Sequence, residues 1–152
     1  NHADRVETLL ASYPDQRATL LPLLWLIQET EGWINPDRIG DVAEIAGVTT
    51  TEVHECVTFY TMYHQHPVGR NFIQVCTTSP CLCAGADDVV KAFLEHTGCQ
   101  ELGLTSPDGK YTVIEVECLG ACGFATPVQI NEDYVESVTP EKVPGILAAL
   151  GD

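Results

Sequence analysis

Two pairs of closely spaced cysteines constrain the fold of this 152-residue chain more than any other feature. Four residues separate Cys76 from Cys81, and three separate Cys118 from Cys122. Each pair is in a segment rich in Gly, Pro and small residues, and each follows an apolar run with the composition of a β-strand. We therefore expect two strand-end loops that meet at one edge of a sheet and enclose a small metal centre.

Four thiolates without a histidine suit either zinc or an iron–sulfur cluster. Zinc knuckles mostly use short spacings, so the wider first pair fits zinc less well. A binuclear cluster is larger than one ion, and four-residue loops are known to span it. Gly85, Gly120 and Gly123 would let backbone N–H groups approach the sulfurs of such a negative cluster. The residues favour the cluster and leave structural zinc and a redox disulfide as alternatives.

The remaining three cysteines are interpreted separately. Cys56 lies on the apolar face of an expected helix and is interpreted as a small buried hydrophobic residue. Cys99 follows an expected helix end without a partner pattern. Cys83 is two residues after Cys81 and could replace it as a ligand, but we expect a spare thiol beside the site. The odd total of seven cysteines argues against a secreted disulfide framework and favours a reducing compartment.

The composition excludes several function classes. With 22 acidic against 7 basic residues, the formal net charge of −15 opposes binding to nucleic acid. The same charge would disfavour adding an electron to a buried cluster. The longest apolar run, residues 20–27, is far shorter than the roughly 20 residues of a membrane span, so we expect a soluble protein without membrane insertion. No GxGxxG sequence or phosphate loop is present, so we expect no nucleotide or flavin site in this chain.

The first part of the chain, residues 1–68, has helical periodicity. We expect a helical bundle here, in which Thr49 and Glu52 form a capping box at the start of the last helix. That helix is expected to run through Phe59 to about Tyr63. The four predicted helices span residues 2–12, 17–31, 36–46 and 50–63.

The pattern changes to alternating strands and helices in residues 69–152. Strands are expected at residues 72–75, 111–116, 128–130 and 134–137, with helices at 86–97 and 140–150. The order β-α-β-β-α predicts an α+β chain, in which the N-terminal helical bundle is followed by a thioredoxin-like domain with a four-stranded mixed sheet.

The chain resembles a known family over nearly its whole length. The family is that of the 24 kDa subunits of NADH–quinone oxidoreductase, respiratory complex I, which are the E subunits of the bacterial complex. Their second domain is a thioredoxin-like [2Fe–2S] ferredoxin. The segments that carry the resemblance are Glu31–Ile34, Thr58–Tyr63, Pro67–Arg70, Ile73–Cys81, Val113–Cys122 and Val128–Asn131.

The resemblance implies one [2Fe–2S] cluster, called N1a in the family, with Cys76, Cys81, Cys118 and Cys122 as its ligands. It implies an electron-transfer subunit, non-autonomous as an enzyme, that accepts an electron from FMN on a 51 kDa flavoprotein subunit, where NADH also binds. It also implies a peripheral arm on the cytoplasmic side of a bacterial inner membrane, or on the matrix side of a mitochondrion. The helical bundle is expected to be a docking arm or a structural element.

Two departures from the family pattern affect the cluster's surroundings. Family members often have a bulky apolar residue and an Arg where this chain has Cys83 and Ala84, and the proline after the last ligand comes one place later, as Pro127 after Thr126. The alternatives that stay open are the equivalent subunit of an NAD-linked hydrogenase or formate dehydrogenase, a zinc-stabilised interaction module, and a stand-alone thioredoxin-like ferredoxin.

Overall fold

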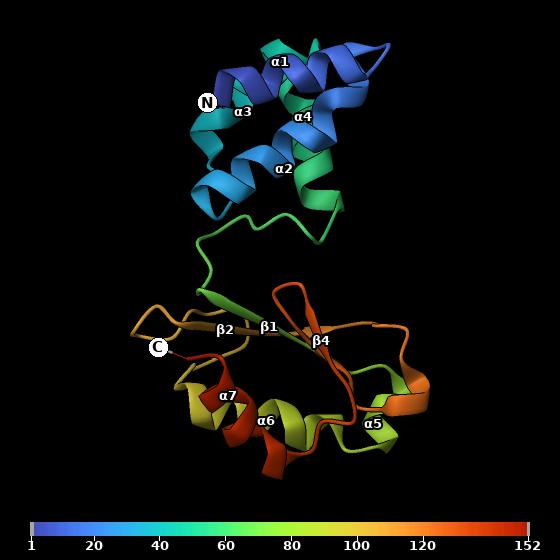
Figure 1. The fold of residues 1–152 in the computed structure, drawn as a ribbon, viewed down its shortest axis with the longest axis vertical. Coiled ribbons are helices and arrows are strands. Elements are labelled where there is room, and N and C mark those ends of the chain that lie inside the picture. Colours follow the sequence, from blue (N-terminus) through green and yellow to red (C-terminus); the bar gives the residue numbers. More distant parts are fainter. Residues whose placement is uncertain (1, 152) are drawn as a thin grey trace. The chain divides into compact units, whose positions relative to one another are not determined.

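The computed structural model describes residues 2–151, which divide between Pro67 and Val68 into two compact units (Figure 1). The sequence placed the domain boundary between residues 68 and 69. Within the described residues, no helix combines the length and the apolar character needed to cross a membrane.

The N-terminal unit is built of helices, as predicted. Two of the predicted helices begin with a separate 3-10 turn, after a side-chain cap from Asp15 in one and Asn35 in the other. The predicted capping box is confirmed, because Thr49 Oγ1 accepts from the Glu52 N–H while the Glu52 carboxylate accepts from the Thr49 N–H. The elements are α1 (His2–Ser12), η1 (Gln16–Thr19), α2 (Leu20–Glu31), η2 (Pro36–Arg38), α3 (Ile39–Ala46) and α4 (Thr50–Phe59).

The last helix of this unit ends earlier than predicted. Helix α4 stops at Phe59, and Tyr60 is already extended, so the prediction of a helix to about Tyr63 was wrong. Tyr63 instead turns inward, where its hydroxyl donates to the Leu21 carbonyl at 3.0 Å. The side chain of Gln28 on α2 also holds this segment. It donates a hydrogen bond to the Met62 carbonyl and accepts one from the His64 N–H. These contacts with α2 are tertiary, so the local helical pattern does not show them.

The C-terminal unit contains a four-stranded mixed sheet in the order β2-β1-β3-β4. Strands β1 and β2 are parallel, and the other two pairs are antiparallel. The predicted α+β class and thioredoxin-like architecture are confirmed. The elements are β1 (Asn71–Cys76), α5 (Ser79–Cys83), α6 (Ala86–Thr97), β2 (Tyr111–Val116), η3 (Cys122–Phe124), β3 (Val128–Ile130), β4 (Asp133–Val135), η4 (Pro140–Lys142) and α7 (Val143–Ala149).

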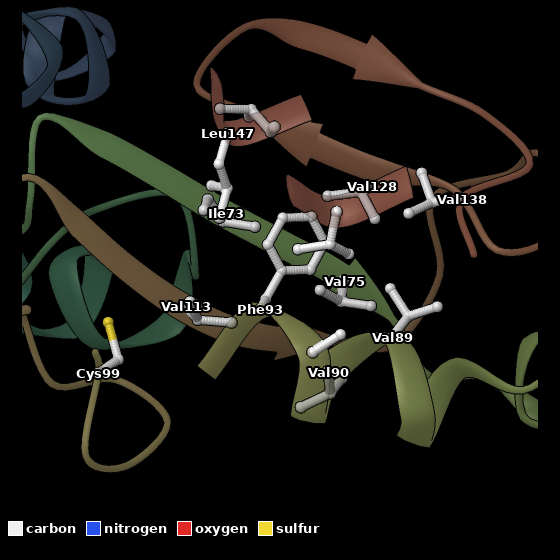
Figure 2. Packing of buried hydrophobic residues seen from close by; sticks show 13 residues of the cluster. Ile73, Val75, Val89, Val90, Phe93, Cys99, Val113, Val128, Val138 and Leu147 are labelled. Atoms are coloured by element: carbon white, nitrogen blue, oxygen red, sulfur yellow. The ribbon is translucent and has the colours of Figure 1, made fainter. Parts of the chain in front are cut away.

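Helices α6 and α7 pack on one face of this sheet (Figure 1). Figure 2 shows the ring of Phe93 on α6 among side chains of the strands, which include Val75 on β1 and Val128 on β3. All three side chains are fully buried. Burial of a side chain as large as Phe contributes roughly 1.5–3 kcal/mol to the free energy of folding. This core fixes the strands from which the two cysteine loops leave.

Candidate metal centre

The two cysteine pairs leave the sheet at the same edge. Cys76 is the last residue of β1 and pairs in register with Val116, the last residue of β2. The pairing continues for one residue, since the Thr77 N–H donates to the Val116 carbonyl at 3.1 Å. Because the strands are parallel and adjacent, Cys118 begins its loop beside Cys76. This edge is the one that the sequence predicted.

The first pair of cysteines is assembled and buried. The Sγ atoms of Cys76 and Cys81 are 3.3 Å apart, and both residues pack against Ala86 at the start of α6. Cys81 lies in α5, a single helical turn where the sequence predicted a loop. Thr78 caps this turn through its carbonyl, which accepts from the N–H of Cys81. The turn reverses the chain and brings the second sulfur back to the first.

The second pair is near the first but more exposed. Cys118 follows β2, Cys122 opens η3, and both are exposed to solvent. Leu119, between them, packs against the buried pair, and Figure 1 shows this orange segment beside α5. Within residues 2–151, no three His, Cys, Asp or Glu side chains are close enough together to hold one metal ion. The structure thus shows one assembled pair of sulfurs, Cys76 and Cys81, with Cys118 and Cys122 on the neighbouring loop.

The electrostatics of Cys81 identify the sulfurs around it. Burial raises the pKa of Cys81 to about 11, with further contributions from its hydrogen bond to Cys76 and from the negative charge of Cys76, Cys122 and Cys118. These are the four cysteines that the sequence proposed as ligands. Cys83, the alternative ligand, is exposed and is not among the groups that shift this pKa.

Backbone N–H groups point at two of the sulfurs. Burial opposes ionisation of Cys76, but hydrogen bonds from the N–H groups of Thr78 and Leu119, from the Cys81 thiol and from the Thr78 hydroxyl together outweigh it and lower the pKa of Cys76. The Gly120 N–H donates to Cys118 Sγ at 3.4 Å. The expectation that Gly120 lets an amide approach sulfur is confirmed. Such donors stabilise negative charge on the sulfurs.

Tyr134 on β4, which was not among the residues predicted from the sequence, also contacts the second cysteine loop. Its hydroxyl donates a hydrogen bond to the Leu119 carbonyl in the loop between Cys118 and Cys122. Partial burial raises the pKa of Tyr134, as does the negative charge of Cys118 and Cys76. No local sequence pattern indicates this contact, because Tyr134 and Leu119 are 15 residues apart in the sequence.

Two buried hydroxyl groups near the cysteines have no nitrogen or oxygen partner. They belong to Thr78, between Cys76 and Cys81, and to Thr126, whose neighbour Ala125 packs against the cluster of Cys76, Cys81 and Ala86. The Thr78 hydroxyl also favours the thiolate of Cys76. A buried hydroxyl without a nitrogen or oxygen partner is costly in an apolar core, but it can donate to a negatively charged sulfur, as that of Thr78 does to Cys76. Four thiols on two loops at one end of the sheet, together with amide and hydroxyl donors, fit a [2Fe–2S] cluster.

Cys56, Cys99 and His64 have other surroundings. Cys56 is partly buried against the core of the helical unit. Cys99 is buried in the core beneath the sheet, where its thiol contacts the Tyr111 carbonyl at 3.5 Å. His64 is half-buried in the connector after α4, and burial lowers its pKa.

Comparison with known proteins agrees with this geometry. The family model described as "Thioredoxin-like [2Fe-2S] ferredoxin" matches residues 6–151. The E subunit of the NADH-quinone oxidoreductase of Rickettsia bellii is 44% identical over 147 residues, which are 95% of this chain and 87% of that protein. NADH dehydrogenase [ubiquinone] flavoprotein 2, mitochondrial, of Dictyostelium discoideum is 42% identical over 146 residues; the match covers 94% of this chain but only 59% of that longer protein.

The fold also has a solved counterpart. A chain of the NAD+-reducing [NiFe]-hydrogenase in the air-oxidized state superposes with a TM-score of 0.73 over 87% of this chain and 22% of its own length. The two sequences are 15% identical, so the likeness concerns the fold alone.

Proposed function

Because the chain belongs to the thioredoxin-like [2Fe-2S] ferredoxin family, together with the E subunits of NADH-quinone oxidoreductase, we propose that it carries electrons within an NADH dehydrogenase module of that kind. The chain is thus a component of a multi-subunit oxidoreductase. The observation that carries the proposal is the placement of two cysteine pairs at the adjacent carboxyl ends of β1 and β2.

Cys76, Cys81, Cys118 and Cys122 would hold the cluster through their thiolates. The buried pair, Cys76 and Cys81, is already in contact at 3.3 Å, so it would bind one iron with little rearrangement. The exposed pair follows β2 and would bind the other iron. Since Cys81 has a pKa of about 11, cluster binding must displace its proton at neutral pH.

A [2Fe–2S] cluster supplies one-electron transfer when it is bound. The chain's own part is to set how readily that electron is accepted. The N–H groups of Thr78, Leu119 and Gly120 donate to ligand sulfurs and so favour added negative charge. Burial of Cys76 and Cys81 and the formal net charge of −15 act in the opposite direction.

We further propose that the electron comes from FMN on a 51 kDa NADH-binding flavoprotein subunit, and that the module belongs to a peripheral arm on the cytoplasmic side of a bacterial membrane or the matrix side of a mitochondrion. The support is the identity to the E subunits of NADH-quinone oxidoreductase, which extends over both units of the chain. The helical unit is the candidate docking arm, because exposed aromatic and apolar side chains gather at and after the end of α4. These are Phe59, Tyr60 and Met62.

Co-expression with the flavoprotein subunit of an NADH-quinone oxidoreductase tests this assignment. We expect one stable complex on gel filtration, in which NADH reduces the cluster of this chain as seen by EPR. Lasting failure to associate would favour a stand-alone ferredoxin. Preferential association with the flavoprotein of an NAD-linked hydrogenase or formate dehydrogenase would move the chain to that class of enzyme.

A further inference from the structure

One peptide group in the ligand loop is held from both sides. The carbonyl of Leu119 accepts a hydrogen bond from the Tyr134 hydroxyl, and the N–H of Gly120 donates to Cys118 Sγ at 3.4 Å. These two atoms belong to the same peptide plane, between residues 119 and 120. The phenol of Tyr134 is therefore connected to the sulfur of Cys118 through a single rigid unit.

The orientation of this peptide depends on its partners. Gly120 has φ of +74°, a conformation that residues with a side chain rarely adopt, and no atom lies within 4 Å of a Cβ added there. The space beside Gly120 is therefore open, so no packing at Gly120 itself fixes the plane, although Leu119 on the other side of the peptide packs against Cys76 and Cys81. Tyr134, by contrast, belongs to β4 and pairs with Gln129 of β3 in the sheet. The sheet therefore holds the backbone of Tyr134 in place.

We propose that Tyr134 is a positioning residue for the cluster, because it holds the Leu119–Gly120 peptide so that the Gly120 N–H donates to the sulfur of Cys118. This inference rests on the proposed function, in which Cys118 is a cluster ligand. A hydrogen bond to a ligand sulfur stabilises the more negative, reduced form and so raises the midpoint potential. Donation from the phenol to the carbonyl polarises the same peptide and strengthens its N–H as a donor.

The test is Tyr134→Phe in the full chain with its cluster, compared with Tyr13→Phe, which removes a phenol from an exposed residue of the helical unit. Midpoint potentials come from redox titration followed by EPR. We expect Tyr134→Phe to make reduction about threefold to tenfold less favourable, which is roughly 30 to 60 mV for one electron, since a neutral hydrogen bond contributes about 1 kcal/mol. Tyr13→Phe should retain the wild-type potential. A wild-type potential in Tyr134→Phe with full cluster content would overturn the inference.

A second measurement applies if Tyr134→Phe fails to keep a cluster. Amide hydrogen exchange of Gly120, followed by NMR in the cluster-free protein, should be faster in Tyr134→Phe than in the wild type and in Tyr13→Phe. An unchanged exchange rate would contradict a positioning role for Tyr134. Failure of the proposed function is distinguishable, because the wild-type chain itself would then bind no [2Fe–2S] cluster.

Discussion

The Sγ atoms of Cys76 and Cys81 lie 3.3 Å apart, although one residue ends strand β1 and the other lies in the short helix α5. Their contact results from the single turn that begins after Thr78. Five residues along an extended chain would separate the two sulfurs by many ångströms. The turn is therefore what makes the first cysteine pair usable as two ligands of one metal atom.

This geometry predicts opposite results for two neighbouring cysteines. Cys81→Ser should lose or strongly perturb the cluster, because it removes a buried sulfur from the assembled pair. Cys83→Ser is the matched control, since it is only two residues away but changes an exposed thiol. Visible absorption and EPR of the purified variants measure the outcome.

Cys118→Ser should resemble Cys81→Ser, because its sulfur accepts the Gly120 amide and belongs to the second pair. If Cys83→Ser bleaches the protein while Cys81→Ser leaves it coloured, the proposed ligand set is wrong.

The sequence predicted most of the sheet and the site, for local reasons. Apolar runs with the composition of strands identified β1 and β2, and the expectation that their two loops meet at one edge agrees with the parallel pairing of these strands. The turn at α5 was missed because a five-residue helix shows too little periodicity. Tyr134 was missed because its bond to Leu119 depends on how the hairpin lies over the loop, which is a tertiary contact.

The close approach of Gly69 to the start of strand β2 predicts that a side chain at this position destabilises the C-terminal unit. A Cβ added to Gly69 would lie 2.5 Å from the backbone carbonyl carbon of Tyr111, and this glycine's N–H also donates to the Thr112 hydroxyl at 2.7 Å. Backbone cannot move aside cheaply, so Gly69→Ala should destabilise the C-terminal unit by about 1–3 kcal/mol. Urea unfolding followed through NMR resonances of β1 and β2 measures the effect.

Gly145→Ala is the matched control for this substitution. Gly145 lies in α7 of the same unit, and no atom is within 4 Å of its added Cβ. Alanine there should stabilise the unit by roughly 0.5–1 kcal/mol, because it favours the helix. Equal effects of the two substitutions would show that the backbones of Gly69 and Tyr111 do not approach as closely as described.

The capping box of α4 predicts a pH dependence. Hydrogen bonds from the backbone and side chain of Thr49, and one from Arg17, lower the pKa of Glu52 to about 2 from its usual 4.5. The folded state thus binds fewer protons on Glu52 than the unfolded state between these values. The stabilising contribution is complete above pH 4.5 and is lost as the pH falls towards 2.

Tryptophan fluorescence reports the unfolding of the helical unit separately from that of the C-terminal unit. The chain has two tryptophans, Trp25 and Trp33, and both are in the helical unit. Glu52→Gln should weaken the dependence of urea unfolding on pH between 4.5 and 2 relative to the wild type. The control Glu44→Gln removes an exposed carboxylate from helix α3 and should leave that dependence in place. An identical pH dependence in Glu52→Gln and wild type would contradict the role given to Glu52.

Metal and sulfide analysis combined with EPR of the dithionite-reduced wild-type chain tests the central claim most directly. We predict a reddish-brown protein with two irons and two inorganic sulfides per chain and a rhombic signal that appears on reduction. A colourless protein that holds one zinc ion per chain and gives no signal would contradict the electron-carrier account.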